Sequence, residues 1–162
     1  FIDGSSTTFY FFEELKKRNL KNITIITNSI FIPREIIMED NMHLVMVGGI
    51  LNKFIGTTDG DLWEIIIKDN FNASKFFFSC YCISPNIGVL DPIQNDANMK
   101  AVFALKSQKK ICLIDSSKFY LMSTFNWLSL KDIDILITDS DIEGKFQDEL
   151  IKSNVRLIIA EQ

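Results

Sequence analysis

Short, unbroken runs of apolar residues recur along this chain, separated by segments with helical spacing. The runs occupy residues 23–27, 42–47, 75–79, 110–114, 133–138 and 155–159. A strand that alternates apolar and polar residues is half buried, whereas a continuous apolar run indicates a strand covered on both faces. Such strands, alternating with helices, are typical of a parallel sheet. The sequence therefore predicts a three-layer α/β fold, with a mostly parallel sheet between helices on both faces.

The segments between these runs predict helices over residues 9–19, 33–38, 59–68, 95–106 and 141–153. Three other segments have no clear periodicity. Residues 50–58 suit a short strand and a loop, residues 84–92 suggest a long polar loop, and residues 120–131 receive no assignment. With 162 residues and ordinary hydrophobic content, we expect a single domain over residues 1–162.

Polar residues or glycines follow most of the predicted strands. Ligands of parallel α/β sheets bind at the carboxyl ends of strands, near the point where the strand order reverses. We therefore expect several of these strand ends to line one rim. They are Asp3–Thr8, Thr27–Ser29, Gly48–Gly49, the residues from Ser79 onward, Asp115–Lys118 and Thr138–Asp139.

The first eight residues, Phe1 to Thr8, combine two apolar residues, an acid, a glycine and four hydroxyl side chains. This pattern predicts a strand end, a tight turn and the start of a helix. A helix start leaves backbone N–H groups unpaired and carries a partial positive charge, so it suits a phosphate. The alternative is a helix cap with a purely structural role, because Ser, Thr and Asp are the usual cap residues.

Two lysines lie close to these polar segments, Lys100 near the long polar loop and Lys118 directly after a predicted strand. Lys100 lies one helical turn after Asp96, and Lys118 follows Asp115 and two serines. If both lysines lean over the rim, they supply mobile positive charges for an anion held by the first turn. The alternatives are a surface ion pair for Lys100 and an ordinary turn for Lys118.

Composition excludes several other classes of function. The net charge of −4 argues against a bare nucleic-acid-binding module, and no apolar run approaches the length that spans a membrane. The single histidine, His43, and the pair Cys80 and Cys82 have too few neighbouring ligands for a metal site. The three cysteines form no disulfide framework, which fits a reducing cytoplasm. We therefore predict no catalytic residue, no metal, no cofactor and no membrane partner.

Seven segments, taken in order, resemble the C-terminal effector-sensing domain of the deoxyribose-operon-repressor (DeoR) family of bacterial transcription regulators. Each segment is weak alone, but the ordered set covers essentially the whole chain. The segments are Phe1–Thr8, Thr27–Ser29, Gly48–Gly49, Gly88–Pro92, Asp96–Lys100, Asp115–Phe119 and Asp134–Asp139.

The resemblance implies a fold similar to that of ribose-5-phosphate isomerase and the CoA transferases, and a phosphorylated sugar as effector. It implies a homo-oligomer, a dimer or tetramer, and a winged helix-turn-helix before Phe1 as the part that binds DNA. We expect that part to be missing from this chain, which begins inside a predicted strand. The loop Asp3–Thr8 would hold the phosphate or sugar hydroxyls, with Lys100 and Lys118 nearby. The predicted ligand-binding residues are Asp3, Gly4, Ser5, Ser6, Thr7, Thr8, Thr27, Asn28, Ser29, Gly48, Gly49, Asp91, Asp96, Lys100, Asp115 and Lys118.

The chain departs from the family pattern at two positions. Ser5 stands where many members have glycine, and Asp96 replaces a more common Glu. A side chain at Ser5 either narrows the approach of a phosphate to the backbone or donates a hydroxyl to it.

Two other functions compete with effector sensing. One is a sugar-phosphate isomerase on the same fold, but the chain has no Lys-Gly dipeptide, and Asp59-Gly60-Asp61 lacks the spacing of the isomerase motif. Proton abstraction needs a positioned base, and only Asp91 and Asp115 are candidates. The other is an oligomerisation domain that has lost its ligand.

Overall fold

A computed structural model describes residues 1–18, 20–36 and 42–160 of the chain. Most of the sheet consists of two parallel ladders. The first pairs β1 (Ile23–Thr27) with β2 (Met42–Met46). The second has the order β11-β10-β8-β5, with β5 (Ala73–Phe78), β8 (Ser107–Leu113), β10 (Ile135–Thr138) and β11 (Arg156–Ile159).

The first three residues of the chain join these two ladders. Ile2 forms parallel bridges with Thr27 on one side and with Phe77 on the other. The N–H of Ile2 donates to the carbonyl of Ile26, and the N–H of Asp3 donates to the carbonyl of Phe77. The chain therefore starts in the middle of the sheet, and later strands are added on both sides of it. The strand order reverses at this point, which is where ligands bind in sheets of this kind.

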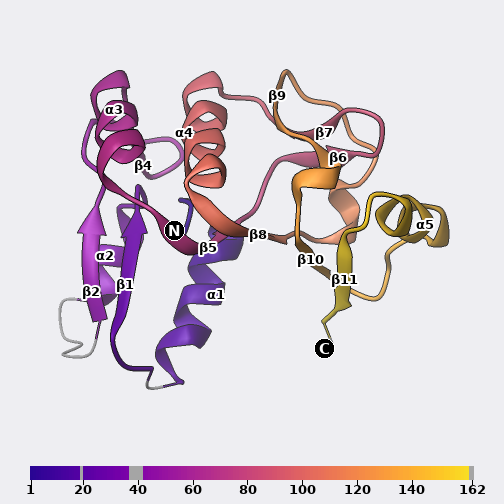
Figure 1. The fold of residues 1–162 in the computed structure, drawn as a ribbon, viewed down its shortest axis with the longest axis horizontal. Helices are drawn as coiled ribbons and strands as arrows, with labels where there is room; N and C mark the ends of the chain where they lie inside the picture. The colour runs from indigo at the N-terminus through magenta and orange to yellow at the C-terminus, as the bar shows by residue number, and fades with distance from the viewer. Residues whose placement is uncertain (19, 37–41, 161–162) are drawn as a thin grey trace.

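Helices cover both faces of the sheet, as the sequence predicts. They are α1 (Ser6–Lys16), α2 (Phe31–Ile36), α3 (Asp61–Asn70), α4 (Gln94–Leu105) and α5 (Gly144–Lys152). Successive residues of a strand face opposite ways. On β5, the ring of Phe76 contacts Phe103 of α4, whereas Phe77 stacks on Phe11 of α1 at a centroid distance of 4.3 Å. Figure 1 shows α3 and α4 side by side at one face, with α1 at the other.

Aromatic side chains fill the larger core cluster. Phe76, Phe78, Phe103 and Phe146 are fully buried, and Phe1 stacks on Phe103 at 4.4 Å. Each buried aromatic ring removes about 150–250 Å² of surface from water, so these rings supply much of the driving force for folding. The packing of Phe1 against Phe103 also fixes the first strand beneath α4.

Three segments differ from the expected structure, because the fold adds antiparallel strands to the parallel sheet. Residues 84–92, expected as a loop, form most of a hairpin of β6 (Cys82–Ser84) and β7 (Gly88–Asp91). Residues 120–131 contain β9 (Phe125–Leu128), which pairs with β7. Residues 50–58 hold β3 (Ile50–Asn52) and most of β4 (Thr57–Asp59), which form a second hairpin. These strands have three or four residues each, too short for a periodic signal in the sequence.

Helix boundaries also shift from their expected positions. Helix α1 begins at Ser6 rather than Phe9, because Ser5 caps it. Helix α3 runs from Asp61 to Asn70 rather than over 59–68, because Asp59 belongs to β4. Helix α2 begins at Phe31 rather than at residue 33, and part of the predicted segment 33–38 lies outside the described residues.

Candidate functional site

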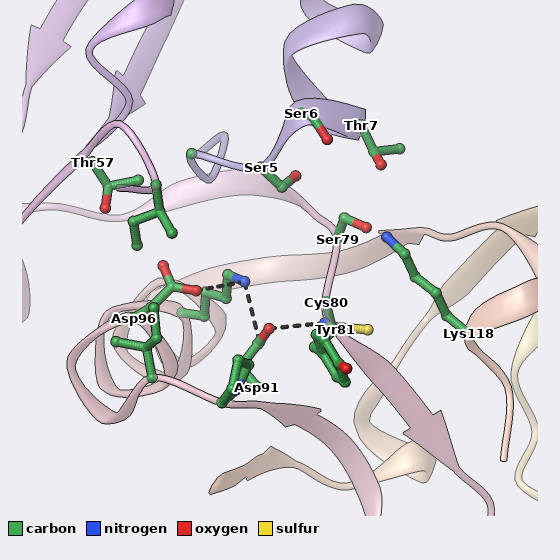
Figure 2. A pocket seen from close by; sticks show the side chains of 15 residues that line it. Ser5, Ser6, Thr7, Thr57, Ser79, Cys80, Tyr81, Asp91, Asp96 and Lys118 are labelled. Carbon is green, nitrogen blue, oxygen red and sulfur yellow. Dashed lines mark hydrogen bonds and ion pairs between the residues drawn. The ribbon is translucent and has the colours of Figure 1, made fainter. Parts of the chain in front are cut away.

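A pocket of about 370 Å³ opens at the carboxyl edge of the sheet, beside the point where the strand order reverses. The turn after the first strand, the end of β5, the start of α4 and the β3–β4 hairpin form its walls (Figure 2). The lining residues are Gly4, Ser5, Ser6, Thr7, Ile55, Thr57, Ser79, Cys80, Tyr81, Asp91, Pro92, Ile93, Asp96, Lys100 and Lys118.

Asp3 organises the base of this pocket but does not line it. Its side chain is buried, and Oδ1 accepts hydrogen bonds from the Ser5 hydroxyl at 2.8 Å and the Thr8 hydroxyl at 2.6 Å. Oδ2 accepts from the backbone N–H of Ser79 at 3.1 Å. Asp3 and Thr8 therefore hold the turn to the end of β5 from beneath.

Helix α1 points its N-terminus at the pocket. The Ser5 hydroxyl accepts a hydrogen bond from the N–H of Thr8, so Ser5 is the N-cap. The backbone N–H groups of Ser6 and Thr7 have no acceptor among the described residues. These two donors and the positive end of the helix dipole face the cavity, an arrangement that suits an anion.

Ser79 presents a buried hydroxyl without a partner. The residue is 1% exposed, and Oγ has no hydrogen-bond partner among the described residues. Buried polar groups in folded proteins are nearly always paired, so an unpaired hydroxyl in a pocket wall indicates a place for a ligand or water atom. Figure 2 shows this hydroxyl between the first turn of α1 and the amine of Lys118.

Lys118 is the more accessible of the two lysines in the wall. Its side chain is 29% exposed, and Nζ lies 3.5 Å from Oδ2 of Asp115, a weak ion pair at the surface. Burial raises the pKa of the Asp115 carboxyl, but hydrogen bonds from Ser117 and the charge of Lys118 outweigh it, so the pKa lies below its usual value. The partly exposed side chain of Lys118 can turn toward an anion held by α1.

Lys100 is buried among three carboxylates. Its Nζ lies 2.8 Å from Asp96, 3.1 Å from Asp91 and 3.6 Å from Asp3. Burial alone would lower the pKa of Lys100, but the three carboxylates raise it well above its ordinary value. Burial raises the pKa of Asp91, although the nearby Lys100 opposes that shift. The cluster therefore holds one ammonium group against three carboxyl groups.

The structure confirms the ion pair between Lys100 and Asp96 but buries it rather than leaving it at the surface. The side chain is only 5% exposed, so it is neither a mobile charge at the rim nor half of a surface ion pair. The spacing from Asp96 does produce the expected ion pair, but α4 turns that pair inward beneath the pocket. Lys100 therefore balances carboxylates rather than offering a free charge to an anion.

Half of the predicted ligand-binding residues line this pocket: Gly4, Ser5, Ser6, Thr7, Asp91, Asp96, Lys100 and Lys118. The other half do not. Asp3 and Thr8 lie beneath it, and the remaining six, Thr27, Asn28, Ser29, Gly48, Gly49 and Asp115, are absent from its walls.

Several of those outer residues have structural contacts. The hydroxyl of Thr27 accepts a hydrogen bond from the N–H of Ser29, and the Asn28 amide donates to the carbonyl of Thr58. Gly49 has φ +140°, and a Cβ there would lie 2.2 Å from the carbonyl oxygen of Asp59. Gly49 therefore lies against the backbone of the β3–β4 hairpin, away from the pocket.

Seven lining residues are absent from the predicted ligand-binding set, although Ser79 begins one of the strand ends that we expected at the rim. The seven are Ile55, Thr57, Ser79, Cys80, Tyr81, Pro92 and Ile93. Ser79 had a signal, since it ends a predicted strand. Thr57 had none, because the β3–β4 hairpin reaches the pocket only in the folded chain. There a Cβ at Gly4 would lie 2.0 Å from Cγ2 of Thr57, so the turn and the hairpin touch.

No group of three His, Cys, Asp or Glu side chains is arranged to hold a metal ion in the described part of the chain. The acidic cluster of Asp3, Asp91 and Asp96 is occupied by the ammonium of Lys100. Within residues 1–18, 20–36 and 42–160, no helix has the length and apolar character needed to cross a membrane.

Comparison with known families gives a match to the DeoR C terminal sensor domain over residues 1–140. Among curated proteins, the chain is similar to the HTH-type transcriptional regulator GolR of Listeria innocua. The two are 28% identical over 151 residues, which cover 91% of this chain and 58% of the relative.

Two further relatives are also regulators. The L-fucose operon activator of Haemophilus influenzae is 25% identical over 146 residues, 90% of this chain and 57% of the relative. The putative aga operon transcriptional repressor of Escherichia coli O157:H7 is 23% identical over 158 residues, 98% of this chain and 58% of the relative. The chain thus spans somewhat less than two thirds of each of these proteins.

Proposed function

Because the chain belongs to the family of DeoR C-terminal sensor domains, we propose that its pocket binds a phosphorylated sugar. In this proposal the phosphate lies against the first turn of α1, and the sugar hydroxyls face the carboxylates at the start of α4. The observation that carries the proposal is the buried, unpaired hydroxyl of Ser79 beside two free backbone N–H groups.

The phosphate side of the pocket has four donors. The N–H groups of Ser6 and Thr7 and the hydroxyl of Ser79 are unpaired among the described residues, and Lys118 adds a positive charge. Hydrogen bonds to a charged acceptor are worth about 1.5–3 kcal/mol each, so a few of them give micromolar binding. An uncharged ligand would gain much less from the same donors.

The sugar side of the pocket offers acceptors instead. Asp96 binds Lys100 through Oδ2 at 2.8 Å, and its carboxylate lines the pocket. Figure 2 shows Asp96 and Lys118 on opposite sides of the pocket. Hydroxyl groups donate readily to carboxylates. A ligand with an anionic end and a hydroxylated end therefore matches both sides.

Binding alone does not regulate transcription. The relatives are transcriptional regulators whose length exceeds that of this chain. We propose that the sensor acts on a DNA-binding part of the full protein, and that the sugar phosphate shifts the equilibrium between two states of the regulator. The shift is limited by the difference in ligand affinity between those states, typically about 1–3 kcal/mol.

We infer that the pocket binds its ligand without transforming it. Asp115, one candidate base, does not line the pocket. Asp91, the other, accepts hydrogen bonds from the Tyr81 N–H, the Trp127 indole and Lys100, so both of its oxygens are engaged. A general base needs both reach and a free oxygen; Asp115 lies outside the pocket walls, and both oxygens of Asp91 already accept hydrogen bonds.

The test measures the thermal midpoint of the domain with matched pairs of ligands, such as glucose 6-phosphate and glucose, over a panel of pentoses and hexoses. We expect at least one phosphorylated sugar to raise the midpoint and its free sugar to leave it unchanged. Equal shifts for both members of every pair would remove the phosphate from the proposal. Turnover of a phosphorylated sugar in an isomerisation assay would favour the enzyme, and no shift at all would favour a domain without a ligand.

A further inference from the structure

The charges of the pocket are divided between its two sides. The amine of Lys118 and the first turn of α1 lie on one side, and the carboxylate of Asp96 lies on the other (Figure 2). Among the lining residues that the structure describes, Lys100 and Lys118 are the only cationic side chains. Because Lys118 lies beside the proposed phosphate site, a second anion in the pocket would depend on Lys100.

Lys100 cannot serve a second anion. Its Nζ lies 2.8 Å from Asp96 and 3.1 Å from Asp91, and only 5% of its side chain is exposed. If Lys100 turned toward a ligand, Asp91 and Asp3 would stay buried without a cation, and an unpaired buried charge is strongly unfavourable. Lys100 therefore stays with its carboxylates.

The carboxylates around Lys100 are held in place as well. Asp91 accepts hydrogen bonds from the Tyr81 N–H at 2.8 Å and from the Trp127 indole at 2.7 Å. These contacts fix Asp91, and Lys100 bridges Asp91 to Asp96. The negative side of the pocket is therefore preorganised, and it has no second arrangement that would offer a free ammonium group.

The start of α4 does not replace the missing cation. A helix start attracts anions, and Ile93 gives this one no side-chain cap. However, Gln94 and Asn95 do not line the pocket, whereas Asp96, the acidic residue of the first turn, does. An anion that approaches α4 from the pocket therefore meets the carboxylate of Asp96.

The donors on the other side suit one anionic group. The hydroxyl of Ser79 is 1% exposed as a residue and has no partner among the described residues, which by itself indicates a place for a ligand atom. It lies between the first turn of α1 and the amine of Lys118 (Figure 2). All the free donors of the phosphate site are therefore gathered at one end of the pocket.

We infer that the pocket selects a sugar with a single phosphate and rejects a sugar that carries a second anionic group at its far end, and that Asp96 sets this specificity. The inference rests on the proposed function and narrows its class of ligand. A second phosphate or a carboxylate would lie against Asp96 without a free cation. Such like-charge repulsion is a common means of excluding a related ligand, whereas neutral hydroxyl groups are accepted.

Titration calorimetry tests the inference with ligands that differ only at the end remote from the phosphate. Glucose 6-phosphate is compared with glucose 1,6-bisphosphate and with 6-phosphogluconate. Fructose 6-phosphate and ribose 5-phosphate are each compared with the corresponding bisphosphate. We expect at least one monophosphate to bind, and its doubly anionic counterpart to bind about tenfold more weakly or worse, because like charges meet at Asp96.

Three variants separate the charge of Asp96 from its shape. Asp96→Asn removes the charge, so the ratio of the two affinities should shift about tenfold in favour of the doubly anionic ligand. Asp96→Glu keeps the charge and should keep the discrimination. Asp69→Asn is the matched control, because that carboxyl is exposed on α3 and lies outside the pocket walls. A purely structural role of Asp96 would weaken both ligands alike and leave the ratio unchanged.

The outcomes distinguish this inference from the proposed function. If a monophosphate binds and its doubly anionic counterpart binds equally well or better, the inference is overturned and the proposed function stands. An unchanged ratio in Asp96→Asn, or an equal change in Asp69→Asn, also overturns it, because the discrimination then does not come from Asp96. If no member of any pair binds, the proposed function fails and the inference fails with it.

Discussion

The backbone N–H of Ser79 donates a hydrogen bond of 3.1 Å to the carboxylate of Asp3. This contact joins the ends of two neighbouring parallel strands at the point where the strand order reverses. The N–H of Ser79 binds Asp3, while the Ser79 hydroxyl lies in the pocket wall with no partner among the residues that the structure describes. The same carboxylate binds the Ser5 and Thr8 hydroxyls in the turn that begins α1, so one buried acid positions both Ser79 and the first turn of that helix.

Replacing Ser79 tests ligand binding separately from the stability of the fold. We expect Ser79→Ala to lower the affinity for the phosphorylated sugar by about 10- to 100-fold, the value of one hydrogen bond to a charged group. Stability should stay the same or rise by up to about 1 kcal/mol, since the hydroxyl has no partner to lose. Ser107→Ala is the matched control, because that hydroxyl is also buried and unpaired but lies outside the pocket. Titration calorimetry measures the affinity, and equal affinities for the two variants would contradict the role of Ser79.

Replacing Lys118 removes a charge from the pocket with little effect on the fold. We expect Lys118→Ala to weaken binding of the phosphorylated sugar about tenfold. Its ion pair with Asp115 is a surface pair worth about 0–1 kcal/mol, so the thermal midpoint should barely change. Lys110→Ala removes a pair of the same length, 3.5 Å to Asp134, outside the pocket. A ligand affinity that changes equally in both variants, or in neither, would exclude a specific contribution from Lys118.

Replacing Lys100 exposes the carboxylate cluster to its own repulsion. Lys100→Met leaves Asp3, Asp91 and Asp96 buried without a cation, and removing one partner of a buried ion pair costs about 3–5 kcal/mol at pH 7. We measure this cost as the loss of unfolding free energy in urea.

The pH dependence of that loss has a definite sign. In the wild type, the raised pKa of Lys100 means that its stabilising charge is present below the pKa of an unfolded lysine and is lost only as the pH rises through the folded value. In Lys100→Met, the pKa of Asp91, which burial already raises, loses the opposing charge of Lys100, so the folded chain keeps a proton that the unfolded chain releases, and stability falls as the pH rises above about 4. The deficit relative to wild type should therefore be larger at pH 8 than at pH 5. A deficit that is the same at both pH values would mean that the cluster is not ionised.

Replacing Gly4 tests the contact between the first turn and the β3–β4 hairpin. A Cβ at this position would lie 2.0 Å from Cγ2 of Thr57, so Gly4→Ala must push the hairpin away. Overpacking of this kind costs about 1–3 kcal/mol. Adding Thr57→Ser removes the methyl group in conflict and keeps the hydroxyl, so it should recover part of the loss. Gly144→Ala, which meets no atom within 4 Å, is the control and should be close to neutral. The double-mutant cycle in thermal midpoint would contradict the contact if the two changes were additive.

The sequence by itself determined the features that depend on neighbours along the chain. Runs of apolar residues predict parallel strands such as β1, whose last three residues are buried, and β10, whose residues are buried or half-buried. The turn before α1 is equally local, since Ser5 caps a helix whose first residues follow it directly. Half of the predicted ligand-binding residues lie in the pocket walls for this reason: they belong to strand ends and helix starts that the pattern identifies.

Only the tertiary structure decided which of these groups meet and which remain free. Helix α4 has buried residues on several sides, among them Met99, Lys100 and Phe103, so its periodicity could not tell that Lys100 points inward. Ser79 and Thr57 come from distant segments, and their positions depend on strand order and on a hairpin too short to leave a periodic signal. Hydrogen-bond partners far apart in the sequence are set by packing, and no local pattern encodes them.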